Sequence, residues 1–387
     1  MSPDLNDEES WFPWHLGISD AHCHPTDTMS SVSKITTMKT NALVLMSTRA
    51  EDQALVSHCT QLYSGDVDDE TSDHQNALLI PSFGWHPWFA HLLFDNNSED
   101  TAEPLTGAAK LNHYSAVLHP KPADENFINS LPDPTPLSGF ISQTRGYLEK
   151  HPLALVGEVG LDRSFRLPAA WTPEEKGKRD DSLTAGGREG RRLTKHKVTL
   201  EHQRKILSAQ LQLAAEMQRP VSIHGVSAHG TLFECIKETW KSLGEKHKHL
   251  RTTVSRTITL STQENSDNDA LECQDYKPHS PRICLHSYSG DSQMIKQYLH
   301  SSVPVDVYFS FSMTINFSNL SMKTEAAVRA IPDKRILVES DLHKAGEVME
   351  ERLEQVIRKV CDIKGWSLDY GVLLLHQNWK CFIYGDK

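Results

Sequence analysis

Eight short runs of apolar residues recur along the chain, and each is apolar nearly throughout rather than alternating with polar residues. Such runs fit strands that are buried on both faces of a parallel sheet. They comprise residues 16–22, 42–48, 78–84, 153–160, 220–225, 282–287, 305–312 and 335–340. The pattern therefore predicts eight parallel strands, and these need crossover connections between successive members.

Helical periodicity falls between several of these runs, with apolar residues returning every three or four positions. The clearest case is "TLEHQRKILSAQLQLAAEMQ" within 199–218. Further helices are expected over residues 138–151, 229–243, 291–301, 321–330 and 346–364. Strands alternating with helices predict the α/β class, and eight such strands predict a (β/α)8 barrel of the TIM type, which needs about 250 residues.

The chain has 387 residues, so the expected barrel leaves a large excess. The excess lies in four segments that are charged or polar and lack convincing periodicity, at about 64–76, 95–137, 165–198 and 248–281. Segments of this composition bury too little apolar surface to fold by themselves. We expect a single domain over 1–387, with a barrel core of about 16–385 and these four segments as loop-like or partly disordered insertions.

Hydropathy and cysteine usage indicate the cellular compartment in which the protein is found. No run reaches the roughly 18 apolar residues that span a bilayer, and the first ten residues, "MSPDLNDEES", are acidic where a signal peptide would be basic and then apolar. The seven cysteines are odd in number and never spaced as C-x-x-C, which suits reduced thiols better than disulfides or a zinc knuckle. These features predict an intracellular protein, in the cytoplasm, the nucleus or both, that does not associate with a membrane.

The charge of the chain is negative overall but uneven. A formal net charge of −11 argues against a surface that binds nucleic acid through Lys and Arg throughout. Residues 176–205 nevertheless hold ten Lys or Arg against four Asp or Glu. This stretch is either a solvated insertion or a binding surface for a polyanion.

Residues of metal-binding type follow the ends of the apolar runs. His22 and His24 are two apart, so on a strand both side chains point to the same side, which in a barrel is the interior near its mouth. Four later runs end with Glu158, His224, His286 and Asp341. Because the carboxyl ends of barrel strands converge on one face, these six side chains should meet there.

Four imidazoles and two carboxylates, with no thiolate, form a ligand set that suits Zn, Mn, Fe, Co or, less well, Mg. A carboxylate can bridge two such ions, and two ions can activate a water and hold both the attacking and leaving oxygens of a phosphodiester. Hydrolysis is the reaction expected of such a centre. The alternative is that these polar residues only cap and solvate the rim of the barrel, which would not require six residues of ligand type.

Seven motifs occur in the order and approximate form of one family: "SDAHCH", "GWHP", "GEVGLD", "VSIHG", "LHSYSG", "YFSFS" and "VESD". With these motifs the chain resembles the TatD family of metal-dependent hydrolases, and "HQNWKCFIYG" looks like that family's closing helix. The resemblance runs from about residue 16 to 385, interrupted by the insertions. It implies a TIM-type barrel, two divalent metal ions (Zn, Mg or Mn) and cleavage of phosphodiester bonds, most often in DNA.

The resemblance also implies roles for individual residues, carried over by position. One ion would be held by His22, His24, Glu158 and Asp341, and the second by Glu158, His224 and His286. Glu158 would bridge the two ions, and Asp341 would also orient or deprotonate the attacking water. These two carboxylates are therefore the catalytic candidates.

Residues around the "GWHP" motif concern the substrate. The resemblance places His86 near the substrate phosphate, and a hydrogen bond to a metal ligand is the alternative role. Trp85, Trp88 and Phe89 either line a wall on which a base stacks or lie buried beneath the 95–137 segment. Cys23, between the two histidines of the first motif, should point away from them and pack against a helix.

Two departures from the family pattern bear on substrate choice. The family usually has an arginine shortly after its fifth-strand histidine, where Gly225 and Val226 stand here, so a phosphate-binding cation is missing. The family's "ETDxP" is "ESDLH" here, with His343 in place of the proline. Basic residues of 176–205, or His229 or His343, could replace the lost arginine.

Two functions of different classes follow. The first is a metal-dependent hydrolase acting on ester bonds, a deoxyribonuclease or phosphodiesterase with DNA or another phosphodiester as substrate. The second is an interaction protein that keeps the barrel and binds a protein partner through its insertions; some eukaryotic TatD-like proteins are described as partners of a cell-cycle ubiquitin-ligase subunit. A complete set of six ligands favours the enzyme, whereas the lost arginine and the negative charge favour the scaffold.

Overall fold

Eight parallel strands form one sheet, and their order in the sheet is their order in the chain. They are β1 (Ser19–Cys23), β2 (Ala42–Met46), β3 (Leu78–Phe83), β7 (Leu155–Asp162), β9 (Val221–Val226), β10 (Arg282–Leu285), β11 (Asp306–Phe311) and β12 (Ile336–Val338). The computed structural model describes residues 11–65, 77–96, 103–242, 244, 279–318 and 322–385. All eight strands predicted from the apolar runs are confirmed.

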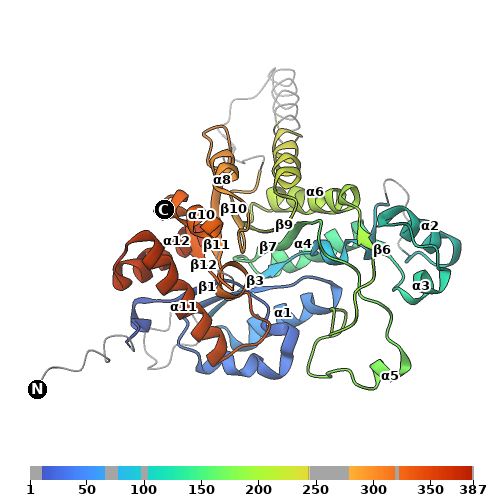
Figure 1. Ribbon diagram of the computed structural model, residues 1–387, viewed down its shortest axis with the longest axis horizontal. Coiled ribbons are helices and arrows are strands. Elements are labelled where there is room, and N and C mark those ends of the chain that lie inside the picture. Colours follow the sequence, from blue (N-terminus) through green and yellow to red (C-terminus); the bar gives the residue numbers. More distant parts are fainter. Residues whose placement is uncertain are drawn as a thin grey trace, which may run out of the picture.

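The sheet closes on itself between its first and last strands. The N–H of Asp341 donates to the carbonyl of His22 (3.0 Å), and the N–H of His24 donates to the carbonyl of Leu342 (2.8 Å). The chain that follows β12 therefore runs beside the end of β1. With helices around the outside (Figure 1), this is the (β/α)8 barrel that the sequence predicted.

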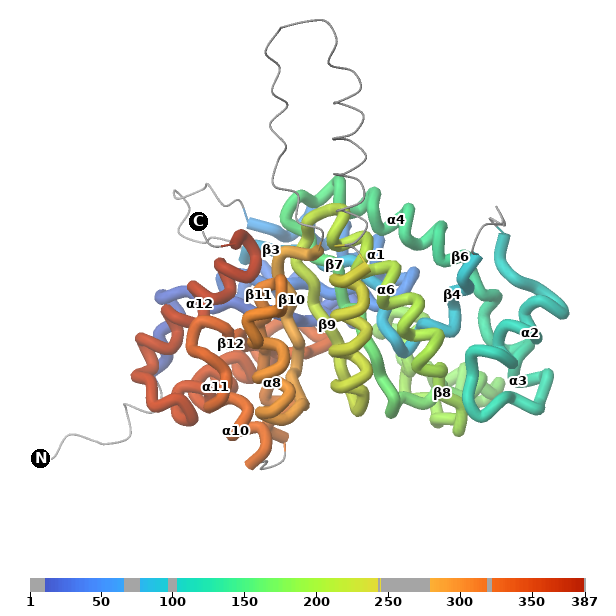
Figure 2. The backbone as a smooth tube through the Cα atoms, turned by 90° about the horizontal axis from the view of Figure 1, so that it is seen from above, coloured from blue at the N-terminus to red at the C-terminus, as the bar shows by residue number. Residues whose placement is uncertain are grey.

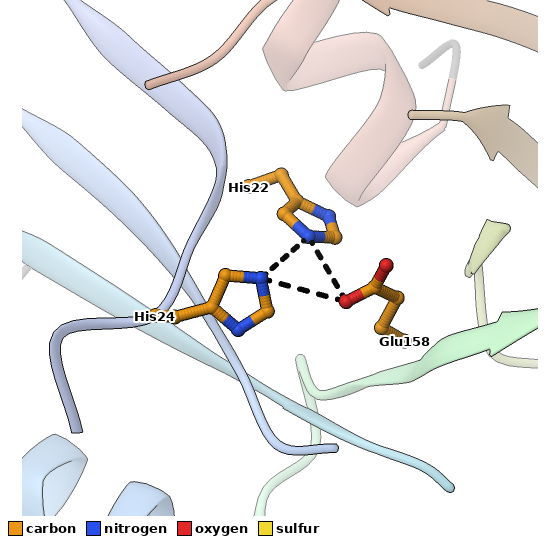
Figure 3. A group of neighbouring side chains, drawn as sticks. All are labelled: His22, His24 and Glu158. Carbon is orange, nitrogen blue, oxygen red and sulfur yellow. Dashed lines mark hydrogen bonds and ion pairs between the residues drawn. The ribbon is translucent and has the colours of Figure 1, made fainter. Parts of the chain in front are cut away.

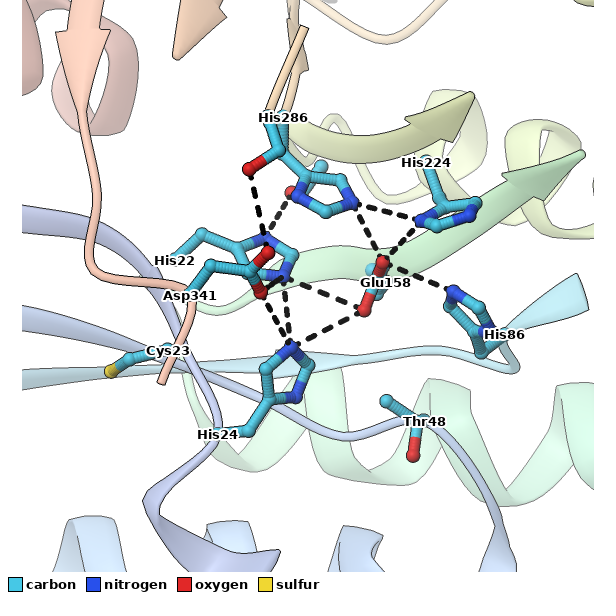
Figure 4. A network of polar contacts seen from close by, with 12 residues as sticks. His22, Cys23, His24, Thr48, His86, Glu158, His224, His286 and Asp341 are labelled. Atoms are coloured by element: carbon cyan, nitrogen blue, oxygen red, sulfur yellow. Dashed lines mark hydrogen bonds and ion pairs between the residues drawn. The ribbon is translucent and has the colours of Figure 1, made fainter. Parts of the chain in front are cut away.

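The strands are apolar throughout because both of their faces are covered. Every residue of β1, β2 and β7 is buried, against the outer helices on one side and other strands' side chains on the other. Inside the barrel, Cys284 packs with residues such as Val44 and Leu337. Cys23 points away from the neighbouring histidines (Figure 4) and lies in the outer core, as expected.

The outer helices lie where the periodicity placed them, within a few residues at each end. They are α4 (Leu137–Lys150), α6 (Leu200–Glu216), a helix over 229–242, α8 (Ser292–Tyr298), α10 (Met322–Ala330) and α11 (Glu347–Lys364). The outer helix α1 (Ala50–Tyr63) was not predicted. Its buried face includes Asp52, Gln53, Ser57 and Thr60 beside its apolar residues, so the hydrophobic period is weak.

The last helix, α12 (Leu368–Tyr384), covers the amino-terminal ends of the strands. Trp379 and Phe382 pack into the cluster that fills the barrel interior. Asn378 donates to the carbonyl of Ile336 at the start of β12 (2.9 Å), and Arg282 at the start of β10 donates to the carbonyl of Phe382 (2.6 Å). One end of the barrel is thereby closed, which leaves the carboxyl-terminal end as the mouth.

Short elements make up the connections. They are η1 (Trp14–Leu16), η2 (Pro25–Thr37), η3 (Pro87–Leu92), β4 (Leu93–Phe94), β5 (Leu118–His119), β6 (Thr135–Pro136), α5 (Pro173–Lys176), β8 (Lys197–Val198), α9 (Met313–Asn316) and η4 (Asp333–Arg335). No helix among the described residues is long and apolar enough to cross a membrane.

The 95–137 segment differs from the expectation of a loop. It contains α2 (Gly107–Val117) and α3 (Glu125–Ser130), which lie at one end of the molecule beyond β4 and β6 (Figure 2). Their few apolar side chains, Tyr114 and Ile128 among them, join a second core with Trp85 and Phe89. A helix this short can hold its place with two or three such contacts, which is too few to give a detectable period.

The other insertions are described only in part. Residues 66–76 and 245–278 lie outside the described residues, so the predictions for most of 64–76 and 248–281 are not addressed. Segment 165–198 contains only α5 and β8 as regular elements and returns to the barrel mouth, where the N–H of Thr184 donates to the carbonyl of Asp27 (2.9 Å). The assignment of 1–387 to a single domain stays a prediction.

Candidate metal centre

The six side chains predicted to meet at the mouth do lie together (Figure 4). His22 belongs to β1, Glu158 to β7 and His224 to β9, whereas His24, His286 and Asp341 follow within three residues of the ends of β1, β10 and β12. The topology explains the convergence, because every one of these strands ends at the same rim.

The first group of donors surrounds one oxygen of Glu158 (Figure 3). His22 Nε2 and His24 Nε2 are 3.0 Å apart, and they lie 3.5 and 3.4 Å from Glu158 Oε2. Asp341 Oδ1 lies 3.5 Å from His24 Nε2 and 3.8 Å from His22 Nε2. These are the four residues that the family resemblance assigned to one ion.

The second group surrounds the other oxygen of the same carboxylate. His224 Nδ1 and His286 Nε2 lie 2.8 and 2.7 Å from Glu158 Oε1, and 3.1 Å from each other. His86 Nε2 lies 3.1 Å from this oxygen as well. Glu158 thus stands between two donor groups and offers one oxygen to each, as its proposed bridging role requires.

The donor spacing suits metal ions. Two nitrogens bound tetrahedrally to one Zn²⁺ at about 2.0–2.1 Å lie roughly 3.3–3.4 Å apart. The two pairs of histidine nitrogens in this centre, at 3.0 and 3.1 Å, are close to that separation. Donor atoms of His22, His24 and Glu158 all lie within 4.8 Å of one another. The residues therefore fit a centre of divalent ions.

Buried polar partners orient the histidines. Ser222 Oγ lies 3.0 Å from His22 Nδ1, and Asp162 Oδ2 lies 3.3 Å from His224 Nε2, so in each ring the other nitrogen faces Glu158. Glu339 lies 3.6 Å from His286 Nδ1 and accepts hydrogen bonds from the N–H and hydroxyl of Ser287. Such partners fix ring orientation and raise the basicity of a ligand.

The sequence interpretation missed these partners. Asp162 and Glu339 stand inside the quoted motifs "GEVGLD" and "VESD", next to residues that were singled out. The signal was an acidic residue at a strand end beside a ligand. Ser222 carried no such signal, because a serine within a buried strand is common and only the fold brings it to His22.

The carboxylates of the centre are held in their ionised form. Burial by itself raises the pKa of Glu158, but His86, His286 and His22 around it outweigh this effect and keep that pKa well below its usual range. Burial likewise raises the pKa of Asp341, and the hydrogen bond with His24 and the charge of His22 more than reverse the shift. Both groups are therefore acceptors at neutral pH.

His86 is a neutral hydrogen-bond donor rather than a further ligand of the same kind. Burial lowers its pKa to about 4. Its Nδ1 accepts from the N–H of Trp88 (3.1 Å), so in the neutral ring the proton sits on Nε2, which faces Glu158. A protonated Nε2 has no lone pair for a metal ion, but it can donate to an anionic oxygen.

A cavity of about 620 Å³ opens over the centre, and His24, Glu158, His224, His286 and Asp341 all line it. Its volume lies within the range of small-molecule sites. Trp88 also lines this cavity and stacks on Phe165 with ring centroids 4.3 Å apart, whereas Trp85 is buried in the second core. Of the aromatic residues near "GWHP", Trp88 and Phe89 reach the site.

Comparison with known sequences gives a consistent result. A family model described as TatD related DNase matches residues 19–383. The Cut9-interacting protein scn1 of Schizosaccharomyces pombe is 35% identical to this chain, over 95% of the chain and 98% of its own length. An uncharacterized deoxyribonuclease of Saccharomyces cerevisiae, YMR262W, is 29% identical over 81% of the chain and 84% of its own length.

Comparison with solved structures supports the fold. The TatD homolog YJJV of Escherichia coli K12 superposes with a TM-score of 0.51 at 15% identity, covering 96% of this chain and 98% of its own. A hydrolase of the TatD family from Entamoeba histolytica gives a TM-score of 0.51 at 12% identity, with coverage of 96% and 99%. At these identities the likeness concerns the fold alone.

Proposed function

We propose that this chain, which belongs to the TatD related DNase family, is a hydrolase that cleaves phosphodiester bonds, with DNA as its substrate. Membership of this family supports metal-dependent hydrolysis; the phosphodiester bond and DNA are the proposal. One observation carries it: the two oxygens of Glu158 face two separate groups of ligand side chains. This arrangement suits a pair of ions bridged by a carboxylate, the type of centre that acts on phosphodiesters.

The residues of the centre would divide the work as follows. Two divalent ions, when bound, would activate a water and stabilise charge on the attacking and leaving oxygens. The two groups of histidines, with Glu158 between them, would hold those ions. The side chain of Asp341 is 13% exposed against 4% for Glu158, so Asp341 is the carboxylate better placed to accept a proton from a water in the cavity.

His86 would bind the substrate in this scheme. Its Nε2–H can donate to a non-bridging phosphate oxygen that enters the cavity, because its Nδ1 already accepts from Trp88. The hydrogen bond to Glu158 seen in the structure is the alternative use of the same proton. Both uses need a neutral imidazole, which the lowered pKa of about 4 supplies.

The decisive experiment is cleavage of single- and double-stranded DNA by the metal-loaded protein with and without a chelator. Asp341→Asn should lower the rate about 100-fold or more, the usual effect of removing a general base. Asp124→Asn, at the exposed start of α3, is the matched control and should cleave at the wild-type rate. Elemental analysis of both variants separates a loss of base from a loss of metal.

If the wild type binds metal but cuts no phosphodiester, the nuclease proposal is wrong. A second function, binding of a protein partner, then moves ahead. The observation that favours it is the 35% identical relative whose name describes an interaction with Cut9. Surfaces on the insertions, such as α2 and α3, would be where a partner binds.

We also propose that the protein is located in the cytoplasm or nucleus. The buried thiols form no disulfide, which is in keeping with such a compartment; they are Cys23, Cys59, Cys235, Cys284 and Cys361.

A further inference from the structure

Among the described residues, no Lys or Arg follows His224 in the lining of the cavity beside the second donor group. Gly225 and Val226 follow His224 and line the cavity, so neither can attract a phosphate by charge. An anionic substrate would approach a centre that also contains the carboxylates of Asp162 and Asp341. A positive side chain at the cavity would offset the repulsion between these groups and the substrate.

Two residues that could replace the missing arginine, His229 and His343, are engaged in other contacts. His229 Nε2 lies 3.2 Å from Ser289 Oγ, and burial lowers the pKa of this histidine, which favours the neutral ring. His343 lines the cavity, but its Nδ1 lies 2.8 Å from Asp27 Oδ2 and its ring stacks on that of His24. A positive charge on His343 would therefore be neutralised by Asp27.

Arg49 also lines the cavity, and its donors are all engaged. Its guanidinium pairs with Asp27 (3.1 Å) and Asp52 (3.1 Å) and is buried. The remaining N–H groups donate to the carbonyls of Ala185 (3.0 Å) and Thr184 (3.3 Å). Arg49 thus anchors the 165–198 insertion to the barrel mouth rather than facing the substrate.

This anchorage brings another arginine to the cavity. Residues 183, 184 and 187–190 line the same cavity as the metal centre, and Arg188 is among them. The neighbouring Glu189 is neutralised by an ion pair with Arg179. Among the described residues, no carboxylate lies within ion-pair distance of Arg188, whose Nε contacts only the carbonyl of Arg191 (3.4 Å).

We propose that Arg188 is the residue that recognises the negatively charged phosphate of the substrate, and that residues 183–190 form a roof which holds it over the centre. The inference rests on the proposed function for the identity of the anion as a phosphodiester. A guanidinium suits the role because its planar set of donors matches two phosphate oxygens at once. The insertion thus supplies the positive charge that β9 lacks after His224.

Binding of two dinucleotide analogues to the metal-loaded protein tests the inference without requiring turnover. Thymidylyl-thymidine with a phosphorothioate linkage keeps the negative charge, whereas the methylphosphonate analogue has nearly the same shape without it. Isothermal titration calorimetry should show that Arg188→Gln weakens binding of the phosphorothioate about tenfold or more, as expected for a lost charge-assisted contact. Binding of the methylphosphonate should change less than about twofold, since no charge is lost there.

Two further variants separate charge recognition from structure. Arg188→Lys keeps the charge without the planar donors and should recover part of the affinity. Arg192→Gln removes an arginine from the same insertion whose side chain is 82% exposed and does not line the cavity, so it should bind both analogues like the wild type. Unchanged metal content in all variants would show that the centre is intact.

The outcomes distinguish this inference from the proposed function. Selective loss of phosphorothioate binding in Arg188→Gln supports it even if DNA proves not to be cleaved. Equal binding by Arg188→Gln and the wild type overturns it while leaving nuclease activity untouched. An equal loss of both analogues, or no phosphorothioate binding by the wild type, also overturns it, because a charge contact cannot then be the role of Arg188.

Discussion

At the scale of single residues, Gly160 decides how closely β7 approaches β9. Its φ is +156°, and a Cβ atom there would lie 1.9 Å from the carbonyl oxygen of His224. Glu158 and His224 come from these two strands and meet at 2.8 Å. The second donor group therefore depends on a residue that has no side chain.

We expect Gly160→Ala to lower the free energy of unfolding by about 3 kcal/mol or more, because the clash is with backbone that cannot turn aside. Urea denaturation measures this. Gly146→Ala in α4 is the matched control: nothing lies within 4 Å of its Cβ position, so it should stabilise by roughly 0.5–1 kcal/mol. Equal stability of the two variants would contradict the account of Gly160.

At the scale of elements, two buried histidines, His91 and His202, and the half-buried His113 hold α2 and η3 against α6. His113 on α2 lies 2.8 Å from the carbonyl of His91 in η3. His202 on α6 lies 2.9 and 3.0 Å from the carbonyls of Ala90 and Leu93, to which its Nε2–H donates. Burial lowers the pKa of His91 to about 3 and that of His202 to about 4, and lowers that of His113 as well.

These pKa shifts make the packing sensitive to acid. In the unfolded chain a histidine takes up its proton near pH 6.5, whereas folded His202 resists protonation until about pH 4. Between these values the unfolded state binds more protons, so stability falls as the pH falls from 6.5 toward 4. We expect denaturant midpoints to drop over this window.

His202→Gln keeps an N–H donor that does not titrate, and it should flatten the pH dependence of the midpoint measurably. His300→Gln, at an exposed position, is the control and should leave the pH dependence as in the wild type. Parallel pH profiles for His202→Gln and the wild type would show that His202 does not contribute.

At the scale of the whole molecule, the candidate centre ties together strands from all around the barrel. Its side chains come from β1, β7 and β9 and from the turns that follow β3, β10 and β12. Ions bound there would join the first and last strands, whose closure rests on few backbone hydrogen bonds. Metal binding should therefore stabilise the whole fold and not only the mouth.

Loading with Zn²⁺ or Mn²⁺ should raise the melting temperature, and a chelator should reverse the rise. An ion present at about 100 times its Kd adds about 2.7 kcal/mol. The His22→Ala/His24→Ala variant should bind less metal and lose most of the rise, whereas a variant with alanine at the exposed His58 and His300 should keep it. Absence of metal from the reconstituted wild type by elemental analysis would refute the centre itself.

The sequence by itself determined the architecture. Eight runs that are apolar nearly throughout specify strands buried on both faces, because a strand with one solvent-exposed face would alternate apolar and polar residues. Such strands with intervening helices leave the barrel as the consistent solution, and the barrel then brings His22, His24, Glu158, His224, His286 and Asp341 to one rim. These features follow from local pattern and topology, so the motifs along the chain were enough to find them.

Only the tertiary structure decided the surroundings of that centre. The pairing of Ser222 with His22 joins residues 200 positions apart, and the contact of Arg49 with Ala185 spans 136 positions. Neither contact produces a hydrophobic periodicity or a motif in the sequence, because a hydrogen bond between distant residues depends on how whole elements pack. For the same reason composition left open whether the basic stretch 176–205 is a solvated insertion or a binding surface for a polyanion, whereas the fold brings residues 183, 184 and 187–190 into the lining of the cavity at the metal centre.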